Sequence, residues 1–277
     1  MATTFVLIAT ASLVGTLTTV AADAEKPLFP DKNLEAVMRK LVFEKRDNDK
    51  PLTEADVANL STISGKGKAI ADLTGLEKCQ SLASLDLADN KIKDLKPIKD
   101  LAKIQYLNIA KNEIEDVSPL SGILALQYIE LSDNAVKDLE PLHGLTNLAS
   151  LYLSRNQISD LQPVLKLLKL RSLYLDNNQV TSLDGIGALK GLSSLSVNSN
   201  AIAKLEPLEG LTELYFLFLE GNKIEDLTPL VAMAKKDYDG QKRFAPFINI
   251  YLKGNPLTAE AKNQLAKLKE YGCRIHY

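Results

Sequence analysis

The sequence has few of the residues on which metal sites and catalytic triads depend. Its 277 residues include only two histidines, His143 and His276, which lie 133 positions apart. A metal cluster or a Ser-His-Asp triad needs its histidine beside other ligands or beside a nucleophile. Neither arrangement is predicted, so we expect no cofactor, no metal and no catalytic residue.

The sequence also lacks the charge pattern of a nucleic-acid-binding protein. Its 33 basic and 35 acidic side chains give a net charge of −2, and no run of basic residues occurs. A protein that binds a polyanion usually carries a basic stripe or patch. With 45% hydrophobic and 25% charged residues, the composition is that of a folded soluble protein, and no nucleic-acid partner is expected.

Charged side chains are absent from the first 22 residues, which are largely apolar. Ala22 and Ala24 supply the small residues that a signal peptidase recognises. We therefore predict a signal peptide over residues 1–24, export to the periplasm, the cell surface or the medium, and no transmembrane span after cleavage. A retained membrane anchor is the alternative, although Thr and Ser dilute the run, which barely reaches the length that spans ~30 Å of hydrocarbon.

The most regular feature of the sequence is a repeat of 22 residues. Eight copies open with leucine or isoleucine at this interval, at Leu60, Leu82, Ile104, Leu126, Leu148, Leu170, Leu192 and Leu214. A ninth copy begins at Phe247, 33 positions after Leu214, because 11 residues are inserted. The shared pattern L-x-x-L-x-L-x-x-N-x-I is that of a leucine-rich repeat.

Each recurrent residue predicts part of the fold. The L-x-L stretch is a short strand, and stacked copies form a parallel sheet with a spacing of roughly 4.8 Å. The recurrent asparagine is expected to bond the backbone of the turns. Because 22 residues leave no room for an α-helix with two loops, the return segment is predicted as a tight turn or 3-10 piece. The fold class is an α/β repeat solenoid with short parallel strands on the concave face and 3-10 or irregular convex segments.

Helices are predicted at both ends of the array. Residues 25–59 hold two helical segments, the first capped by Asp31, and are expected to form an N-terminal cap. The repeats extend over residues 60–257 with nine strands, and residues 258–277 form a helical C-terminal cap that stops at Gly272. The insertion at about 233–246 is predicted to extend a helix, with an exposed basic loop as the alternative.

The 22-residue copies, the leading helical segments and the phrase IADLTGLEKC at Ile70–Cys79 resemble the internalin-type leucine-rich repeat proteins that bacteria export. The resemblance covers almost all of the chain after the leader, and it implies a binding protein without catalytic chemistry. Phosphatase-regulating leucine-rich repeat subunits share the repeat length. An intracellular regulatory or scaffold protein is therefore the alternative function, and it requires an uncleaved leader.

The outward side chains of the predicted strands differ among the copies and are the candidates for recognition. Seven of the 27 outward positions are aromatic, against fewer than two for an even spread of the 16 Phe and Tyr. Such aromatics among Ser and Asn are typical of surfaces that bind proteins, although they also stack structurally across sheets. The candidate partner-binding residues are Tyr106, Tyr128, Glu130, Tyr152, Tyr174, Asp176, Phe216, Phe218 and Tyr251.

Two small residues interrupt the predicted row of aromatics. Ser194 and Ser196 follow the copy of Tyr174 and precede the copy of Phe218. They predict a notch into which a bulky side chain of the partner would insert. Tyr174 and Phe218 would form its walls and are the expected hot spots of binding.

Paired carboxylates are the remaining route to an enzyme. Asp86 and Glu130 share one outward column two copies apart, which places their backbones roughly 9 to 10 Å from each other. Inverting glycosidases need ~6.5 to 9.5 Å between carboxyls, but an open sheet has no pocket to raise one pKa. We predict a monomeric, non-enzymatic protein that binds a protein or peptide on its concave sheet, with a glycan-binding or glycosidase-like surface as a remote alternative.

The two cysteines are predicted to be free thiols. Cys79 takes a position that leucine holds in later copies, so it is expected to be buried, and Cys273 lies in the final cap. Eight spacings of ~4.8 Å place them roughly 38 Å apart, far beyond the ~7 Å that a disulfide allows between Cα atoms.

Overall fold

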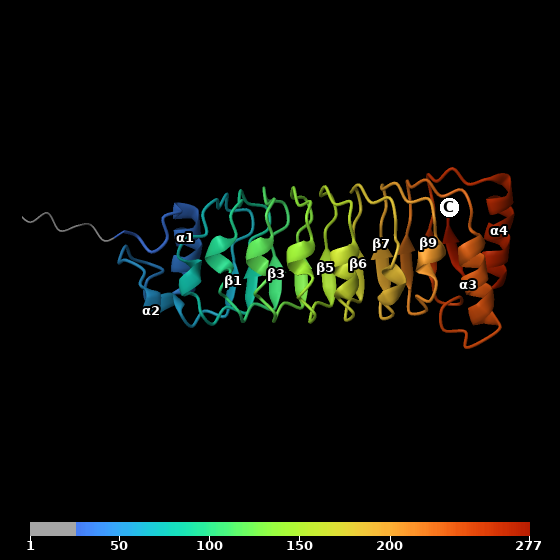
Figure 1. Ribbon diagram of the computed structural model, residues 1–277. Helices are drawn as coiled ribbons and strands as arrows, with labels where there is room; N and C mark the ends of the chain where they lie inside the picture. Colours follow the sequence, from blue (N-terminus) through green and yellow to red (C-terminus); the bar gives the residue numbers. More distant parts are fainter. Residues whose placement is uncertain (1–25) are drawn as a thin grey trace, which may run out of the picture.

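A computed structural model describes residues 26–277, which form one elongated stack of coils (Figure 1). Ten strands make a single parallel sheet in sequence order. They are β1 Thr62–Ser64, β2 Ser84–Asp86, β3 Tyr106–Asn108, β4 Tyr128–Glu130, β5 Ser150–Tyr152, β6 Ser172–Tyr174, β7 Ser194–Ser196, β8 Phe216–Phe218, β9 Asn249–Tyr251 and β10 Arg274–His276. From β1 to β8 each residue pairs with the one 22 positions later, so the repeat length sets the register. The predicted signal peptide and its cleavage site lie outside the described residues.

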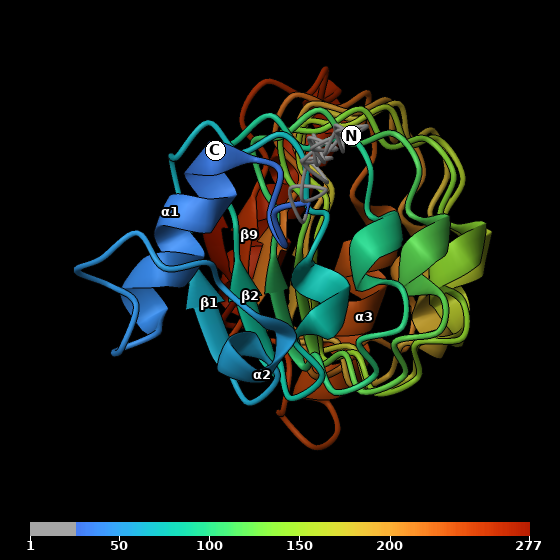
Figure 2. The ribbon, with the colours of Figure 1, turned by 90° about the vertical axis from the view of Figure 1, so that its left-hand side faces the viewer.

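Short 3-10 helices return the chain on the side away from the sheet, as Figure 2 shows by looking along the stack. They are η1 Leu76–Lys78, η2 Lys96–Ile98, η3 Ser118–Leu120, η4 Glu140–Leu142, η5 Gln162–Lys166, η6 Ile186–Ala188 and η7 Glu206–Leu208. Five of them carry proline in their first turn. Gly75 takes the position that Pro97 and Pro119 hold in the next two coils. Its φ is +101°, and a Cβ there would lie 2.3 Å from the carbonyl oxygen of Leu28, so only glycine fits.

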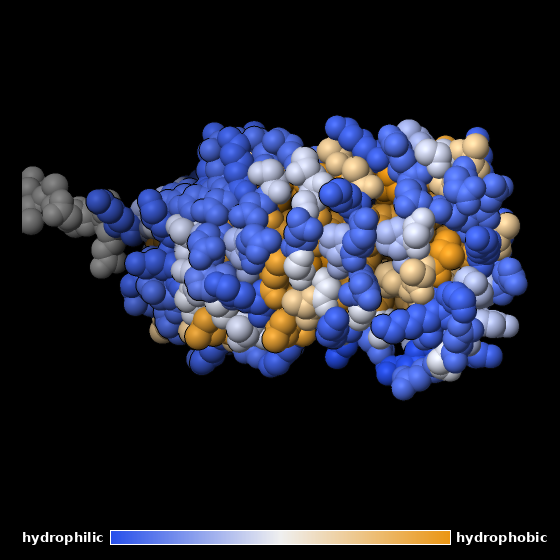
Figure 3. Space-filling model, turned by 45° about the vertical axis from the view of Figure 1, so that its right-hand side comes forward, coloured by the Kyte–Doolittle hydropathy of each residue, from blue (hydrophilic) through white to orange (hydrophobic). Residues whose placement is uncertain are grey.

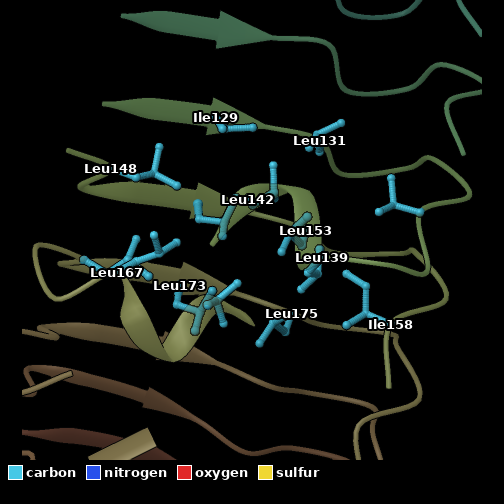
Figure 4. Close-up of a cluster of buried hydrophobic side chains, with 14 of the residues drawn as sticks. Ile129, Leu131, Leu139, Leu142, Leu148, Leu153, Ile158, Leu167, Leu173 and Leu175 are labelled. Carbon is cyan, nitrogen blue, oxygen red and sulfur yellow. The ribbon is translucent and has the colours of Figure 1, made fainter. Parts of the chain in front are cut away.

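The hydrophobic core runs along the whole stack between the sheet and the 3-10 helices. Leucine and isoleucine from the strands meet those from the return segments, as Figure 4 shows for Ile129, Leu142 and Leu153, all fully buried. Each such side chain contributes about 1.5–3 kcal/mol when it leaves water. Since each coil buries its leucines against its neighbours, no coil has a complete core alone.

The predicted asparagine ladder is confirmed. The Asn156 Oδ1 atom accepts from the backbone N–H of Val136 at 3.0 Å, and its Nδ2 donates to the carbonyl oxygens of Leu131 and Leu153 at 3.0 and 2.9 Å. Equivalent side chains bond neighbouring coils at Asn90, Asn112, Asn134, Asn178, Asn200, Asn222 and Asn255. The ladder satisfies backbone groups that would otherwise be unpaired in the interior.

Helices flank the repeats at the N-terminal end. Helix α1 (Lys32–Leu41) begins at Asp31, whose Oδ1 accepts from the N–H groups of Asn33 and Leu34. The other oxygen of Asp31 accepts from Ala71 N at 2.7 Å and so ties this helix to the first coil. Helix α2 (Glu54–Val57) follows before β1.

The C-terminal end differs from the prediction in its number of strands. Helix α3 (Thr228–Tyr238) occupies the last return segment, and α4 (Ala259–Glu270) is followed by Gly272 with φ +97°. The chain then forms β10 against β9, with Arg274 N donating to Ile248 O at 3.0 Å. The nine strands predicted within residues 60–257 are present, and β10 is an additional strand in the C-terminal cap that was not predicted. The open edge of β9 supplies backbone partners to a segment that carries no leucine pattern.

Within residues 26–277, none of the helices combines the length and the apolar character that crossing a membrane requires.

Candidate partner-binding surface

The predicted partner-binding residues all lie on the outer face of the sheet. Eight belong to strands whose outward side chains alternate with fully buried leucines or isoleucines, and Asp176 follows β6 by two residues. The alternation arises because successive side chains of a strand point to opposite faces. The structure therefore brings these residues together on one surface.

Four tyrosines stack across neighbouring strands. Ring centroids lie 4.6 Å apart between Tyr106 and Tyr128, 5.3 Å between Tyr128 and Tyr152, and 4.9 Å between Tyr152 and Tyr174. These separations are close to the ~4.8 Å spacing of strands, so each ring meets the next without distorting the sheet. The row shifts by two residues between β4 and β5, where the rings of Tyr128 and Tyr152 tilt by 41°.

The row continues past β7 to the C-terminal strands. The Tyr174 and Phe218 rings lie 6.4 Å apart, Phe218 stacks on Tyr251 at 4.5 Å, and Tyr251 stacks on His276 at 4.2 Å. We call the six aromatic side chains of this row the aromatic stripe. They are Tyr106, Tyr128, Tyr152, Tyr174, Phe218 and Tyr251.

The notch expected at Ser194 and Ser196 is not open, and that prediction is wrong. Ser194 and Ser196 are 7% and 2% exposed, and the Tyr174 hydroxyl hydrogen-bonds to Ser194 Oγ at 2.8 Å. Serine leaves space that the flanking rings of Tyr174 and Phe218 fill by leaning toward each other. The aromatic stripe is thus continuous across β7.

The sequence reasoning missed two aromatics beside the stripe. Tyr215 and Phe247 are each 47% exposed, with ring centroids 6.5 Å apart, and they extend the aromatic surface beyond Phe216, which is 43% exposed. Tyr215 precedes its strand at a place where the earlier copies have Gln, Ala, Arg or Ser, such as Gln127 and Ala149. This difference from the other copies is the feature of the sequence that could have identified Tyr215.

The two carboxylates among the predicted residues are bonded by the chain itself. Glu130 accepts from Ser132 N at 2.8 Å. Asp176 accepts from Asn198 N at 2.8 Å and from the hydroxyls of Ser154 and Ser196. These bonds hold the turns after the strands and leave Asp176 little capacity for a partner.

Burial, and after it the nearby Glu130 carboxylate, raises the pKa of Tyr128 well above its usual range. The phenol therefore stays protonated, and its O–H remains a hydrogen-bond donor at every physiological pH.

The described residues offer no metal site, because no group of three or more His, Cys, Asp or Glu side chains is arranged to hold an ion. Cys79 and Cys273 are buried free thiols, and burial raises the pKa of each to about 12. A thiol with such a pKa is a poor nucleophile because its thiolate is scarce.

Family models for leucine-rich repeats match residues 80–122, 125–166 and 168–209, each with two copies. Comparison with curated protein sequences gives no match. Among solved structures, internalin C2 from Listeria monocytogenes is 31% identical with a TM-score of 0.71, over 83% of this chain and 95% of that one. The functional domain of InlJ from Listeria monocytogenes shares the fold, at 24% identity and a TM-score of 0.64, over 90% of this chain and 60% of that one. With its 22-residue coils and its 31% identity to an internalin that it covers almost completely, the chain belongs to the internalin-type leucine-rich repeat proteins.

Proposed function

We propose that the protein is a non-enzymatic, exported bacterial binding protein that takes a protein or peptide ligand on the outer face of its sheet. The observation that carries this proposal is the aromatic stripe, which runs over seven strands from β3 to β9. Tyrosine and phenylalanine dominate the energetics of protein interfaces.

The stacking of the rings favours binding because it orders them in advance. Immobilising a flexible side chain on association costs about 0.5–1.5 kcal/mol, and a ring held between two neighbours has lost most of that freedom already. Tyr152 is held in this way between Tyr128 and Tyr174. With the notch closed, the ligand would rest on the ridge of rings, and Tyr174 and Phe218 stay its central residues.

Photo-crosslinking in the cells that make the protein tests where the ligand lies. Tyr152 is replaced with a benzoyl-phenylalanine, which keeps an aromatic ring at the site. The matched control places the same group at Leu168, which is 64% exposed and outside the strands. We expect a discrete protein adduct from position 152 and none from position 168. Identical adducts from both positions, or none from 152, would refute binding on the sheet.

Export is tested separately by mass spectrometry of the native N-terminus. We propose cleavage after Ala24, so the mature chain is expected to begin at Glu25. A native chain that begins at Met1 or Ala2 would contradict export and favour the intracellular regulatory function.

A further inference from the structure

A groove lies on the opposite side of the molecule from the sheet, between η7 and α3. It arises because α3 has 11 residues where η7 has three, so the helix and the loop after it extend beyond the preceding coil. Figure 2 shows α3 among the 3-10 helices and away from the strands. The groove is therefore separate from the aromatic stripe.

The loop that closes one end of the groove is held by its own hydrogen bonds. The Asp237 carboxylate accepts from the backbone N–H groups of Arg243, Phe244 and Ala245 at 2.9, 2.9 and 2.8 Å. Phe244 is only 1% exposed, and the Arg243 guanidinium pairs with Glu213 of the preceding coil. The wall is thus formed before any ligand arrives, which lowers the ordering cost of binding.

The interior of the groove is mainly apolar. Its volume is about 570 Å³, within the range of known ligand sites, and Pro229, Ala232, Met233 and Phe244 line it. Figure 3 shows hydrophobic surface between hydrophilic side chains on the part of the molecule that includes α3. An apolar side chain of a ligand would find a matching surface here.

Acidic side chains outnumber basic ones in the lining of the groove. Four carboxylates and two basic side chains line it, and Lys190 reaches its rim at Gly210. Asp226 is bonded by Gln264 and Thr228, as Asp237 is by the loop. Within residues 26–277, Glu206 and Glu209 of the η7 wall have no ion-pair partner. These two carboxylates are free to bind a cation.

We propose that this groove binds a peptide segment of another protein that inserts one apolar side chain and places a lysine or arginine against Glu206 and Glu209. The segment would lie along α3, with its apolar side chain against Pro229, Ala232 and Met233. Because the groove and the sheet are on opposite sides, both can be occupied at once. The inference does not depend on the function proposed for the aromatic stripe.

The absence of tryptophan from the chain allows a direct test by fluorescence. N-acetyl-Lys-Trp-Lys-amide is titrated with the purified protein, so that all tryptophan emission comes from the peptide. We expect saturable binding with a blue shift. Glu206→Gln and Glu209→Gln should each raise the Kd about twofold to fivefold, as for exposed ion pairs. Ala232→Arg, at an exposed place on α3, should abolish binding.

The matched control is Glu140→Gln, since Glu140 holds the place of Glu206 three coils earlier and should leave the Kd unchanged. The control peptide is N-acetyl-Glu-Trp-Glu-amide, which should not bind. The proposal is overturned if the acidic peptide binds as tightly, if the groove variants bind like the unmodified protein, or if no saturable binding occurs. Loss of binding on Tyr174→Ala would also overturn it, because the peptide would then sit on the aromatic stripe.

Discussion

At the scale of single residues, the asparagine ladder shows how one side chain holds two coils together. Asn156 is 8% exposed and satisfies backbone groups of its own coil and of the preceding one. A buried backbone group without a partner costs about 1–3 kcal/mol. Each asparagine therefore contributes to stability in proportion to the groups it would leave unpaired.

Asn156→Ala should lower the free energy of unfolding by about 1–3 kcal/mol, because it leaves the buried N–H of Val136 without a partner. The carbonyl oxygens of Leu131 and Leu153 keep the bonds from Asn134 and Asn178. Urea unfolding followed by circular dichroism measures the loss. Asn147→Ala is the control, since Asn147 is exposed, and it should cost less than about 1 kcal/mol. Equal losses in the two variants would contradict the role of the ladder.

Burial of the two thiols predicts a pH dependence. Burial raises the pKa of Cys79 and Cys273 from 9.0 to about 12, so only the unfolded chain loses these protons as the pH rises above 9. Their contribution to stability is complete below pH 9 and is lost between pH 9 and 12.

Burial of the thiols also predicts their reactivity. A disulfide reagent should react with both thiols in denaturant without reductant, but in the native protein only at the rate of unfolding. Rapid reaction of the native thiols would refute their burial.

Some contacts of single residues could not be predicted from the sequence. The 22-residue period identified every strand from β1 to β8, the asparagines of the ladder from Asn90 to Asn222 and the outward columns. It did not show that Tyr174 bonds Ser194 and leans over β7, because ring direction depends on the size of the neighbouring side chains. It also could not show that Asp176 is already bonded by Asn198 N.

At the scale of elements, the irregular segments were the hardest to predict. Helix α3 was expected from the composition of the insertion, and it extends to Tyr238 with Asp239 as its C-cap. The loop after it follows no repeated pattern. Its path depends on the Asp237 carboxylate, and Asp237 belongs to no motif that the sequence shows. Strand β10 is held by backbone pairing with β9, which leaves no side-chain pattern.

Asp237→Ala should open the loop of residues 239–246 and leave the coils intact. Three hydrogen bonds to a charged acceptor are lost, each worth about 1.5–3 kcal/mol. Trypsin should then cleave faster after Lys242 and Arg243. Asp239→Ala removes only an exposed pair with Lys235 and should leave the cleavage rate unchanged. Equal rates in both variants would show that the carboxylate does not hold the loop.

At the scale of the whole molecule, the coils are interchangeable units because their register is constant. Removing residues 126–147 joins Ala125 to Leu148 and should restore the same pairing one coil shorter. We expect a cooperatively unfolding protein with native-like circular dichroism. A product that does not fold would contradict the stacked register.

We propose that the aromatic stripe binds the partner as well as stacking on itself. Because the rings of Tyr174 and Phe218 contact their neighbours, alanine at either site should cost about 0.5–1.5 kcal/mol of stability and lower the Tm by about 2–4 °C per kcal/mol. If a ring also contacts the partner, its replacement by alanine should lower the free energy of binding by more than it lowers the free energy of unfolding.

Calorimetric titration of the partner captured by crosslinking, with Tyr174→Ala, Phe218→Ala and the control Leu124→Ala, tests this claim most directly. Leu124 is 57% exposed and outside the strands, so its variant should bind like the unmodified protein. Tyr174→Ala and Phe218→Ala should each weaken binding at least tenfold, which corresponds to about 1.4 kcal/mol. Normal binding by both variants, together with a lower Tm, would mean that the aromatic stripe is a structural stack and that the partner binds elsewhere.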